Sequence, residues 1–188
     1  MKEQPTLEMD RLILRPFTLA DADDVRRLAG DRAVADTTLN IPHPYPSGAA
    51  EAWINLHAPK YDSGELATFA ITRRDDGCLL GAVGLQINHS QSRAELGYWV
   101  GLPFWNCGYC TEAASRLLEF AFAELGLHRV LAYHLTRNPA SGRVMQKIGM
   151  IKEGELRQHS CRWGKHEDLV VYGILADEYQ RSHQDPPA

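Results

Sequence analysis

The 188-residue chain has no apolar run long enough to cross a membrane, and its polar start at Met1 to Gln4 does not form a signal peptide. We therefore expect a cytoplasmic location and no membrane partner, with all four cysteines reduced. The net charge of −4 disfavours nonspecific binding to nucleic acid. This length is typical of one domain, which we expect over residues 1–181, before a polar, disordered tail at 182–188.

One common site motif is incomplete. Cys107 and Cys110 have the C-x-x-C spacing of a metal or redox pair, but no second C-x-x-C or H-x-x-x-H follows to complete a zinc site. The pair also lacks the context of a thioredoxin site, which ends a strand early in a βαβ unit. We expect no metal and interpret these cysteines as small residues beside a loop. A redox or metal protein stays open as an alternative.

Residues 94–126 have the clearest pattern in the chain. Leucine, tyrosine and valine alternate with other residues over 94–100, which is the period of a strand, and Pro103 prevents that strand from continuing. Apolar residues then recur at helical spacing over 113–125, and Gly126 ends the run. The segment therefore predicts a strand, a tight loop and a long amphipathic helix.

The loop in this segment predicts a site for an anion. Asn106 and Gly108 tolerate positive φ, so successive backbone N–H groups turn toward one point at the N-terminus of the helix. The loop has neither the lysine of a Walker motif nor the G-x-G-x-x-G spacing of a dinucleotide fold. What remains is a small pocket for a diphosphate, with Tyr109 and Thr111 nearby.

The rest of the chain alternates between helices and strands. Before the central segment we expect a strand at Leu7–Leu14, a helix after Thr18, a proline-containing loop at 36–46, a second helix capped by Ser47, and strands at 66–72 and 79–87. After it we expect a strand at 129–136 parallel to the strand at 94–100, a helix from Pro139 capped by Asn138, and strands at 150–157 and 169–175.

The order of these elements resembles the GNAT acyltransferase fold. Glu95–Val100 together with Trp105–Ala113 resembles the acetyl-CoA-binding motif of that superfamily, and Asn138–Ser141 with Gly149–Met150 resembles the motif that follows. Arg11–Pro16 and Pro42–Pro46 look like the branch that contains the ribosomal-protein N-acetyltransferases. The resemblance extends from Leu7 to about Tyr179.

This resemblance implies an α+β fold (α/β mixed) with a central mixed, largely antiparallel sheet of about seven strands and four flanking helices. It also implies acetyl-CoA as cosubstrate. The residues that it implies for cofactor binding are the backbone of Trp99 and Val100 for the pantetheine arm, Cys107, Gly108, Tyr109, Cys110 and Thr111 for the diphosphate, and Asn138. Asn106 and Cys110 depart from the family pattern, where Gly and Ala are commoner.

The family chemistry implied is direct transfer of an acetyl group to a primary amine. An ammonium group has no lone pair, so a base must first accept a proton. Glu95, on the strand face that also carries Trp99, is the first candidate for this base and His134 is the second. The N–H of Val100 is a donor for the developing oxyanion. Ser141 matches the position where the family places a hydroxyl for the departing thiolate.

The acceptor is expected to be the N-terminal amine of a protein or a small-molecule amine, and we expect no nucleic-acid partner. The residues predicted to shape its site are His43, Tyr45, Trp53 and His134. A noncatalytic acyl-CoA sensor is the alternative to an active enzyme. The sequence leaves open whether the protein forms a homodimer.

Overall fold

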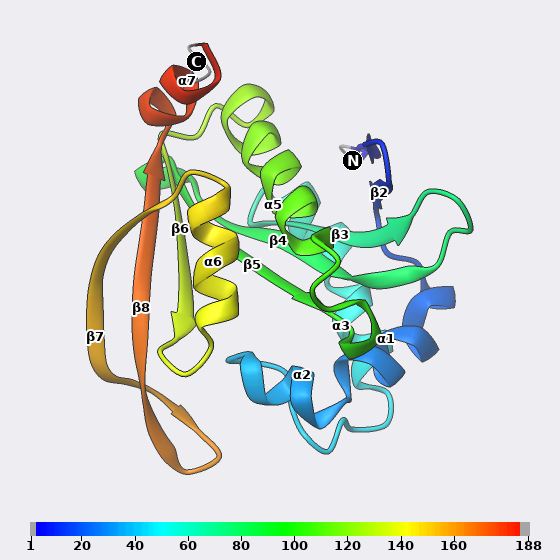
Figure 1. Ribbon diagram of the computed structural model, residues 1–188. Coiled ribbons are helices and arrows are strands. Elements are labelled where there is room, and N and C mark those ends of the chain that lie inside the picture. The colour runs from blue at the N-terminus through cyan, green and yellow to red at the C-terminus, as the bar shows by residue number, and fades with distance from the viewer. Residues whose placement is uncertain (1–2, 185–188) are drawn as a thin grey trace.

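The computed structural model describes residues 3–184 and contains an eight-stranded sheet in the order β1-β2-β3-β4-β5-β6-β8-β7 (Figure 1). The strands are β1 (Leu7–Glu8), β2 (Leu12–Arg15), β3 (Leu66–Arg73), β4 (Leu79–Asn88), β5 (Arg93–Val100), β6 (Arg129–Leu135), β7 (Ile151–Arg162) and β8 (Lys165–Leu175). Neighbouring strands are antiparallel, except that β5 and β6 are parallel. The predicted parallel pair is therefore confirmed.

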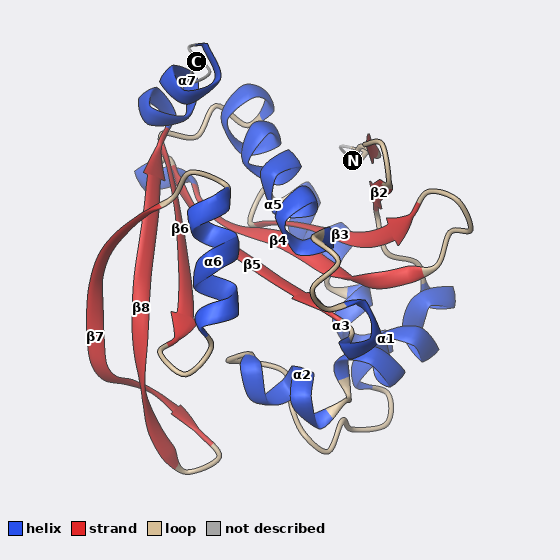
Figure 2. Ribbon diagram, viewed as in Figure 1, coloured by secondary structure: helices blue, strands red, loops and turns tan. Residues whose placement is uncertain are grey.

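Helices lie on both faces of this sheet (Figure 2). They are α1 (Ala22–Ala29), α2 (Arg32–Thr37), α3 (Ala49–Asn55), α4 (His57–Asp62), α5 (Tyr109–Glu119), α6 (Pro139–Lys147) and α7 (Ala176–Gln184). The last turns of α5 continue as a π-helix at Phe120–Glu124. Over residues 3–184, none of these helices has both the length and the apolar character that a membrane span requires.

Two hydrophobic cores follow from the alternation of side chains along the strands. Phe69 and Ile71 of β3 belong to the larger core beneath α5 and α6, whereas Ala70 belongs to the core beneath α1 and α3. In β5, Leu96 joins the first core and Trp99 packs against the second. Even-numbered residues of β5 therefore face α5 and α6, and odd-numbered residues face α1 and α3.

The structure corrects the single strand expected at Leu7–Leu14. Two short strands, β1 and β2, pair in its place as a hairpin in which Leu7 lies opposite Leu14. The backbone N–H of Met9 donates to the carbonyl of Leu12 at 2.9 Å and closes the turn. The chain reverses here because it buries Leu7 and Leu12 and leaves the polar residue Asp10 toward solvent. This hairpin raises the strand number from seven to eight.

The helices also differ from the four that were expected. α2 was missed, although Asp31 caps it by accepting a hydrogen bond from the N–H of Ala33 at 2.8 Å. The helix expected after Ser47 is divided into α3 and α4, because Pro59 has no N–H to continue the hydrogen-bond ladder. Its first cap is Gly48, with φ 76°, and not Ser47.

The C-terminal segment and the last hairpin also differ from what the sequence predicts. α7 was not predicted. It extends through Gln184, into the segment expected to be a disordered tail, and residues 185–188 lie outside those that the structure describes. β7 and β8 are longer than predicted and form a hairpin whose tip lies near α2 (Figure 1).

The sheet opens between β5 and β6. These strands pair only from Arg93 with Arg129 to Leu96 with Ala132. Each then continues without the other, β5 to Val100 and β6 to Leu135, and Figure 1 shows the two diverging toward α2. The divergence leaves backbone groups of both strands without their sheet partner at the place where α5 and α6 begin.

Candidate active site

The loop between β5 and α5 has the backbone conformation that its sequence predicts. Asn106 has φ 61° and Gly108 has φ 81°, both in the left-handed region. The N–H of Glu112 donates to the carbonyl of Gly108 at 3.1 Å and closes the first turn of α5. Within the described part of the chain, no acceptor contacts the backbone N–H groups of residues 107–111. They lie at the positive end of the helix dipole and suit an anion.

Arg11 reaches this loop from the turn between β1 and β2. Its guanidinium pairs with the Glu112 carboxylate at 2.6 Å, donates to the carbonyl of Cys107 at 3.3 Å and lies 5.0 Å from the ring centre of Tyr109. Hydrogen bonding to Glu112 raises the pKa of Arg11. Sequence reasoning assigned Arg11 only to a family motif. Its contacts join residues about a hundred positions apart, which no local pattern reveals.

The backbone of β5 presents donors to the gap beside β6. The N–H of Gly101 donates to the carbonyl of Leu80 in β4 at 2.9 Å. Because backbone groups alternate in direction along a strand, those of Trp99 also face β4, and those of Tyr98 and Val100 face the gap. The backbone contact expected of Trp99 is thereby reassigned to Tyr98, since Trp99 contributes its side chain to the cavity wall. The backbone of Val100 faces the gap, and its contact with a cofactor stays a prediction.

The N-terminus of α6 places Ser141 at the edge of the same gap. The Asn138 side-chain oxygen accepts from the N–H of Ser141 at 3.3 Å, which confirms the predicted cap. The amide nitrogen of Asn138 donates to the carbonyl of Thr37 at 3.2 Å, so both ends of this amide have protein partners. The geometry gives Asn138 a positioning role, and a direct cofactor contact is not needed to explain it.

The hydroxyl of Ser141 lies 3.0 Å from the hydroxyl of Tyr98. The same phenol lies 3.0 Å from the carbonyl oxygen of Ser141, to which it can only donate. Burial raises the pKa of Tyr98, so its phenol stays protonated at neutral pH. Tyr98 was not predicted as a side chain of the site. Its even position on β5 points it toward α6, and only the packing of α6 on the sheet reveals this contact.

Glu95 lines the cavity from the opposite strand face, which it shares with Trp99. Its carboxylate has no hydrogen-bond or ion-pair partner among residues 3–184. The protein around it removes part of its water, and this desolvation raises the pKa of its carboxyl group. A carboxylate with a raised pKa and no partner is available to accept a proton.

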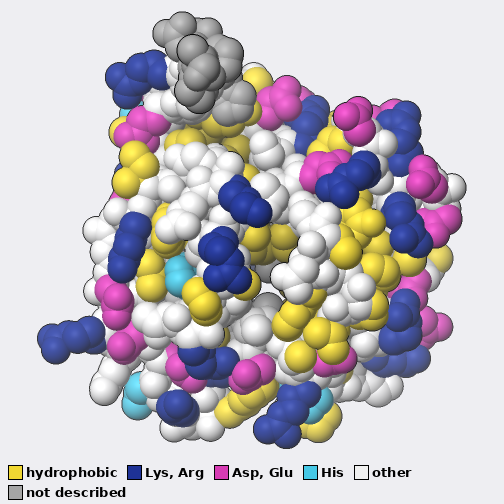
Figure 3. Space-filling view, in the orientation of Figure 1, with side chains coloured by type: hydrophobic (Ala, Val, Ile, Leu, Met, Phe, Trp, Pro, Cys, Tyr) yellow, Lys and Arg dark blue, Asp and Glu magenta, His cyan; other side chains and the backbone are white. Residues whose placement is uncertain are grey.

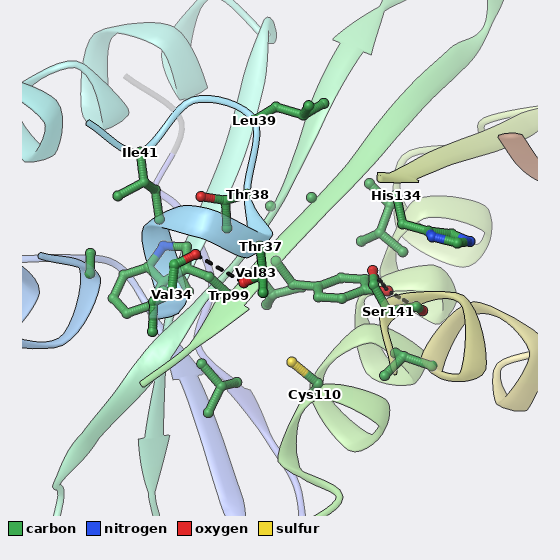
Figure 4. Close-up of a pocket in the computed structure, with 18 of the residues that line it drawn as sticks. Val34, Thr37, Thr38, Leu39, Ile41, Val83, Trp99, Cys110, His134 and Ser141 are labelled. Carbon is green, nitrogen blue, oxygen red and sulfur yellow. Dashed lines mark hydrogen bonds between the residues drawn. The ribbon is translucent and has the colours of Figure 1, made fainter. Parts of the chain in front are cut away.

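One cavity of about 710 Å³ joins these features. Figure 3 shows a hollow among hydrophobic side chains on the face that carries α5 and α6. In Figure 4, Ser141 and His134 lie at one end of the cavity, and Val34, Ile41 and Trp99 lie at the other. The cavity therefore has a polar end beside α6 and a mainly apolar end beside α2, where Thr37 and Thr38 also line it.

The residues predicted for the acceptor do not all reach this cavity. Tyr45, Trp53 and His134 line it. His134 is buried, and its Nδ1 lies 2.8 Å from the carbonyl of Leu135. His43 is not among the lining residues, because its Nδ1 lies 3.1 Å from the carbonyl of Gly30 and its ring turns toward Trp163, 6.4 Å away. His43 therefore holds the loop between α2 and α3 through Gly30 and Trp163, and does not line the cavity.

Comparison with known families gives a match to the acetyltransferase (GNAT) domain over residues 11–151. The chain belongs to the GNAT family. YoaA of Bacillus subtilis, an uncharacterized N-acetyltransferase, is 33% identical over 91% of this chain and 97% of its own. YdaF of Bacillus subtilis, a candidate ribosomal N-acetyltransferase, is 36% identical over 56% of this chain and 58% of its own. The resemblance to the ribosomal-protein acetyltransferase branch is thereby confirmed.

Solved structures show the same GNAT fold. The spermidine N-acetyltransferase from Vibrio cholerae, solved in complex with CoA and spermine, has a TM-score of 0.78. It is 22% identical to this chain, and the match covers 90% of this chain and 98% of the other. The predicted fold class is therefore confirmed, with one strand more than expected.

The cysteines of this GNAT chain have separate environments. Cys107 is exposed, with its Sγ 3.5 Å from the carbonyl of Trp105. Burial raises the pKa of Cys110 to about 12, which keeps its thiol protonated and unreactive at neutral pH. Within residues 3–184, no three His, Cys, Asp or Glu side chains come together as a metal-binding group. The small size of Cys110 suits its place in the cavity wall.

Proposed function

We propose that this protein transfers an acetyl group from acetyl-CoA to a primary amine by direct attack in a ternary complex. The observation that supports the proposal most is the row of free donors along one cavity. The free backbone N–H groups are those of residues 107–111 and of Tyr98 and Val100, and they lead to the hydroxyl of Ser141, which contacts Tyr98 and would have to turn from it to donate to a ligand. Membership of the GNAT family and the likeness to a protein solved with CoA support the same chemistry.

The chain has the groups that acetyl-CoA requires. The N–H groups from Cys107 to Thr111 would bind the diphosphate at the N-terminus of α5, with the Arg11 guanidinium beside them. The amides of the pantetheine arm would pair with the gap-facing backbone of Tyr98 and Val100, as an added strand does. The acyl end would then lie beside Ser141.

Three groups of this chain would handle the charges of the reaction. Glu95 accepts the proton of the acceptor ammonium, directly or through water, and so leaves a lone pair on nitrogen. The N–H of Val100 donates to the carbonyl oxygen on which negative charge develops. The C–N bond forms as the C–S bond breaks, and the hydroxyl of Ser141 hydrogen-bonds the departing sulfur while Tyr98 supports that hydroxyl. The ammonium loses two protons in all. Glu95 accepts the first and passes it to solvent, and the second, lost from nitrogen after the attack, balances the proton gained by the departing thiolate.

Titration calorimetry with CoA, followed by mass spectrometry of products from acetyl-CoA with pooled peptides, small amines and polyamines, tests this function. We expect binding of CoA and a product heavier by one acetyl group on nitrogen. Binding without transfer to any amine would favour the noncatalytic sensor. If CoA does not bind, or if a soaked crystal places it away from residues 107–111, the proposal fails.

A further inference from the structure

The end of the cavity beyond Trp99 is walled by apolar side chains. Besides the ring of Trp99 it is bounded by apolar side chains from α1, α2, α3 and the loop between α2 and α3, and by one from the segment between β5 and α5. They are Val25, Ala29, Val34, Ile41 and Trp53, and Phe104. Most of these side chains belong to the core beneath α1 and α3 or pack against it. Figure 4 shows Val34, Ile41 and Trp99 together at this end. An alkyl chain or an aromatic ring would replace water there favourably.

The cavity offers one carboxylate to an acceptor. Glu95 is the only aspartate or glutamate among the lining residues that the structure describes. The cations of the lining, Arg143 and Lys147, are on α6. A single ammonium group beside Glu95 has a charged partner, whereas a second ammonium farther along the acceptor would meet apolar side chains.

A buried cation behind the apolar wall would also disfavour a second ammonium group on the acceptor. Arg162, at the end of β7, is 8% exposed and donates to the carbonyls of Ala35, Leu39 and Ile41, the first at 2.7 Å. No carboxylate within residues 3–184 forms an ion pair with it. The positive charge thus lies directly behind the backbone that forms the wall, where it repels a second cation.

Two carboxylates of the elements around this wall are already paired. Asp36 at the end of α2 and Glu167 of β8 both bind Arg137, at 2.9 and 3.1 Å. They neutralise that arginine and do not line the cavity. The acceptor end therefore combines apolar walls, one carboxylate and a cation behind the wall.

We infer that the acceptor is a monoamine that carries an apolar group of alkyl or single-ring size a few bonds from its nitrogen, and that polyamines are poor acceptors. This inference rests on the proposed acetyl transfer and adds the chemical class of the amine. The apolar group fills the space between Trp99 and Val34, and the ammonium lies beside Glu95. The same chemistry is found in a free arylalkylamine and in a peptide whose first residue is aromatic.

A matched pair of amines tests the charge. Hexylamine and 1,6-diaminohexane have the same carbon chain and differ by one ammonium group, so their kcat/KM values at saturating acetyl-CoA compare that charge alone. We expect hexylamine to be preferred at least tenfold. 2-Phenylethylamine and a pentapeptide that begins with phenylalanine, each compared with spermidine, then distinguish the free amine from the peptide as the source of the acceptor.

A variant that adds one carboxylate to the cavity tests the cause. Asn40 lines the cavity and is exposed, and Asn40→Asp changes its charge with almost no change in size. We expect the ratio of diamine to monoamine kcat/KM to rise threefold or more. Asn88→Asp adds the same charge on an exposed residue outside the cavity, and we expect it to leave the ratio unchanged.

The outcomes separate this inference from the proposed function. Acetylation of 1,6-diaminohexane or spermidine as fast as, or faster than, hexylamine and 2-phenylethylamine overturns the inference while it supports acetyl transfer. An equal shift of the ratio in both variants would also overturn it, because the wall would then have no part in the selection. Failure of every amine together with failure to bind CoA overturns the proposed function itself.

Discussion

The two ends of the cavity are built from different parts of the polypeptide. At the end proposed to bind the cofactor, here called the cofactor end, the groups available are mostly backbone N–H donors, at residues 107–111 and in the unpaired half of β5. At the acceptor end they are side chains from α1, α2, α3 and the loop between α2 and α3. Backbone donors would bind acetyl-CoA, which every reaction of the family would share. Side chains would bind the amine acceptor, which differs between reactions.

The two ends also differ in how they are held. The cofactor end is held mainly by local structure, the conformation of its own loop and the start of α5, with Arg11 as a contact from a distant segment. The acceptor wall is fixed by residues distant in sequence. Arg162 binds one carbonyl of α2 and two of the loop between α2 and α3, and Asn138 binds the carbonyl of Thr37. We therefore expect substitutions at the two ends to change different kinetic constants.

The largest effect is expected at Ser141, where the proposed acyl transfer would take place. Ser141→Ala removes the hydroxyl beside Tyr98 but keeps the backbone N–H that Asn138 caps. We expect kcat to fall by about a hundredfold, the low end for loss of a general acid, with little change in the KM of acetyl-CoA. Steady-state kinetics measure both constants.

Ser63→Ala is the matched control for this variant. The Ser63 hydroxyl only bonds the carbonyl of Lys60, at 3.1 Å, and it lies outside the cavity. Its kcat should equal that of the parent protein. If Ser141→Ala also keeps the parent kcat, Ser141 has a structural role only, and its proposed part in acetyl transfer is wrong.

A smaller effect, restricted to the cofactor, is expected at Gly108. Its φ of 81° is strained for a β-branched residue by about 1–2 kcal/mol, and a Cβ there would lie 3.5 Å from Arg11. Gly108→Val should raise the KM of acetyl-CoA about tenfold and leave the acceptor KM unchanged at saturating acetyl-CoA. Gly77→Val imposes similar strain, at φ 69°, in the distant turn between β3 and β4, where nothing lies within 4 Å. An equal rise in both variants would contradict binding of the diphosphate by this loop.

The acceptor end should respond in the opposite way when Arg162 is replaced. Arg162→Met keeps much of the side-chain volume and removes the hydrogen bonds to the loop between α2 and α3. We expect the acceptor KM to rise about fivefold and that of acetyl-CoA to stay constant. Arg157→Met, on an exposed residue of the same strand, is the control. A rise in both KM values would mean that the hairpin supports the whole site.

The cofactor end is the part that could be predicted from sequence. Alternation in residues 94–100 and the pair Asn106 and Gly108 are local patterns, and local patterns fix a strand, a tight loop and the start of a helix. The cap at Asn138 is equally local, since it joins residues three positions apart. The binding roles of these residues stay predictions, but their conformations are confirmed.

The other features of the site and of the fold depend on contacts between segments that are distant in sequence, or on elements too short to show a pattern. Arg11 meets the α5 loop and Arg162 meets the loop after α2 over about a hundred residues or more, and nothing near either arginine in sequence marks its partner. The direction of the Trp99 backbone depends on the register of β5 with β4, which composition does not give. α2 is too short for helical periodicity to reveal it.

The smallest effect on activity is expected at His57, which supports the acceptor end from the core. His57 is 4% exposed, packs against Phe17 and Trp53, and neither ring nitrogen has a hydrogen-bond partner within the described residues. Burial lowers its pKa to about 4. The folded state therefore holds this ring neutral, whereas the unfolded chain protonates it below a pH of about 6.5.

The sign of the pH dependence follows from these two states. Between about pH 6.5 and pH 4 the unfolded state binds the additional proton, so the stabilisation present at pH 7.5 is lost as the pH falls, by at most about 3 kcal/mol. His57→Phe keeps an aromatic ring, removes the titration and removes two unsatisfied nitrogens. Urea unfolding at pH 7.5 and pH 5 should show a smaller loss of stability for this variant than for the parent, with kcat/KM at pH 7.5 within about twofold. His128→Phe changes an exposed residue and should keep the parent pH dependence of stability. An equal change in both variants would mean that the burial of His57 is not the cause of that pH dependence.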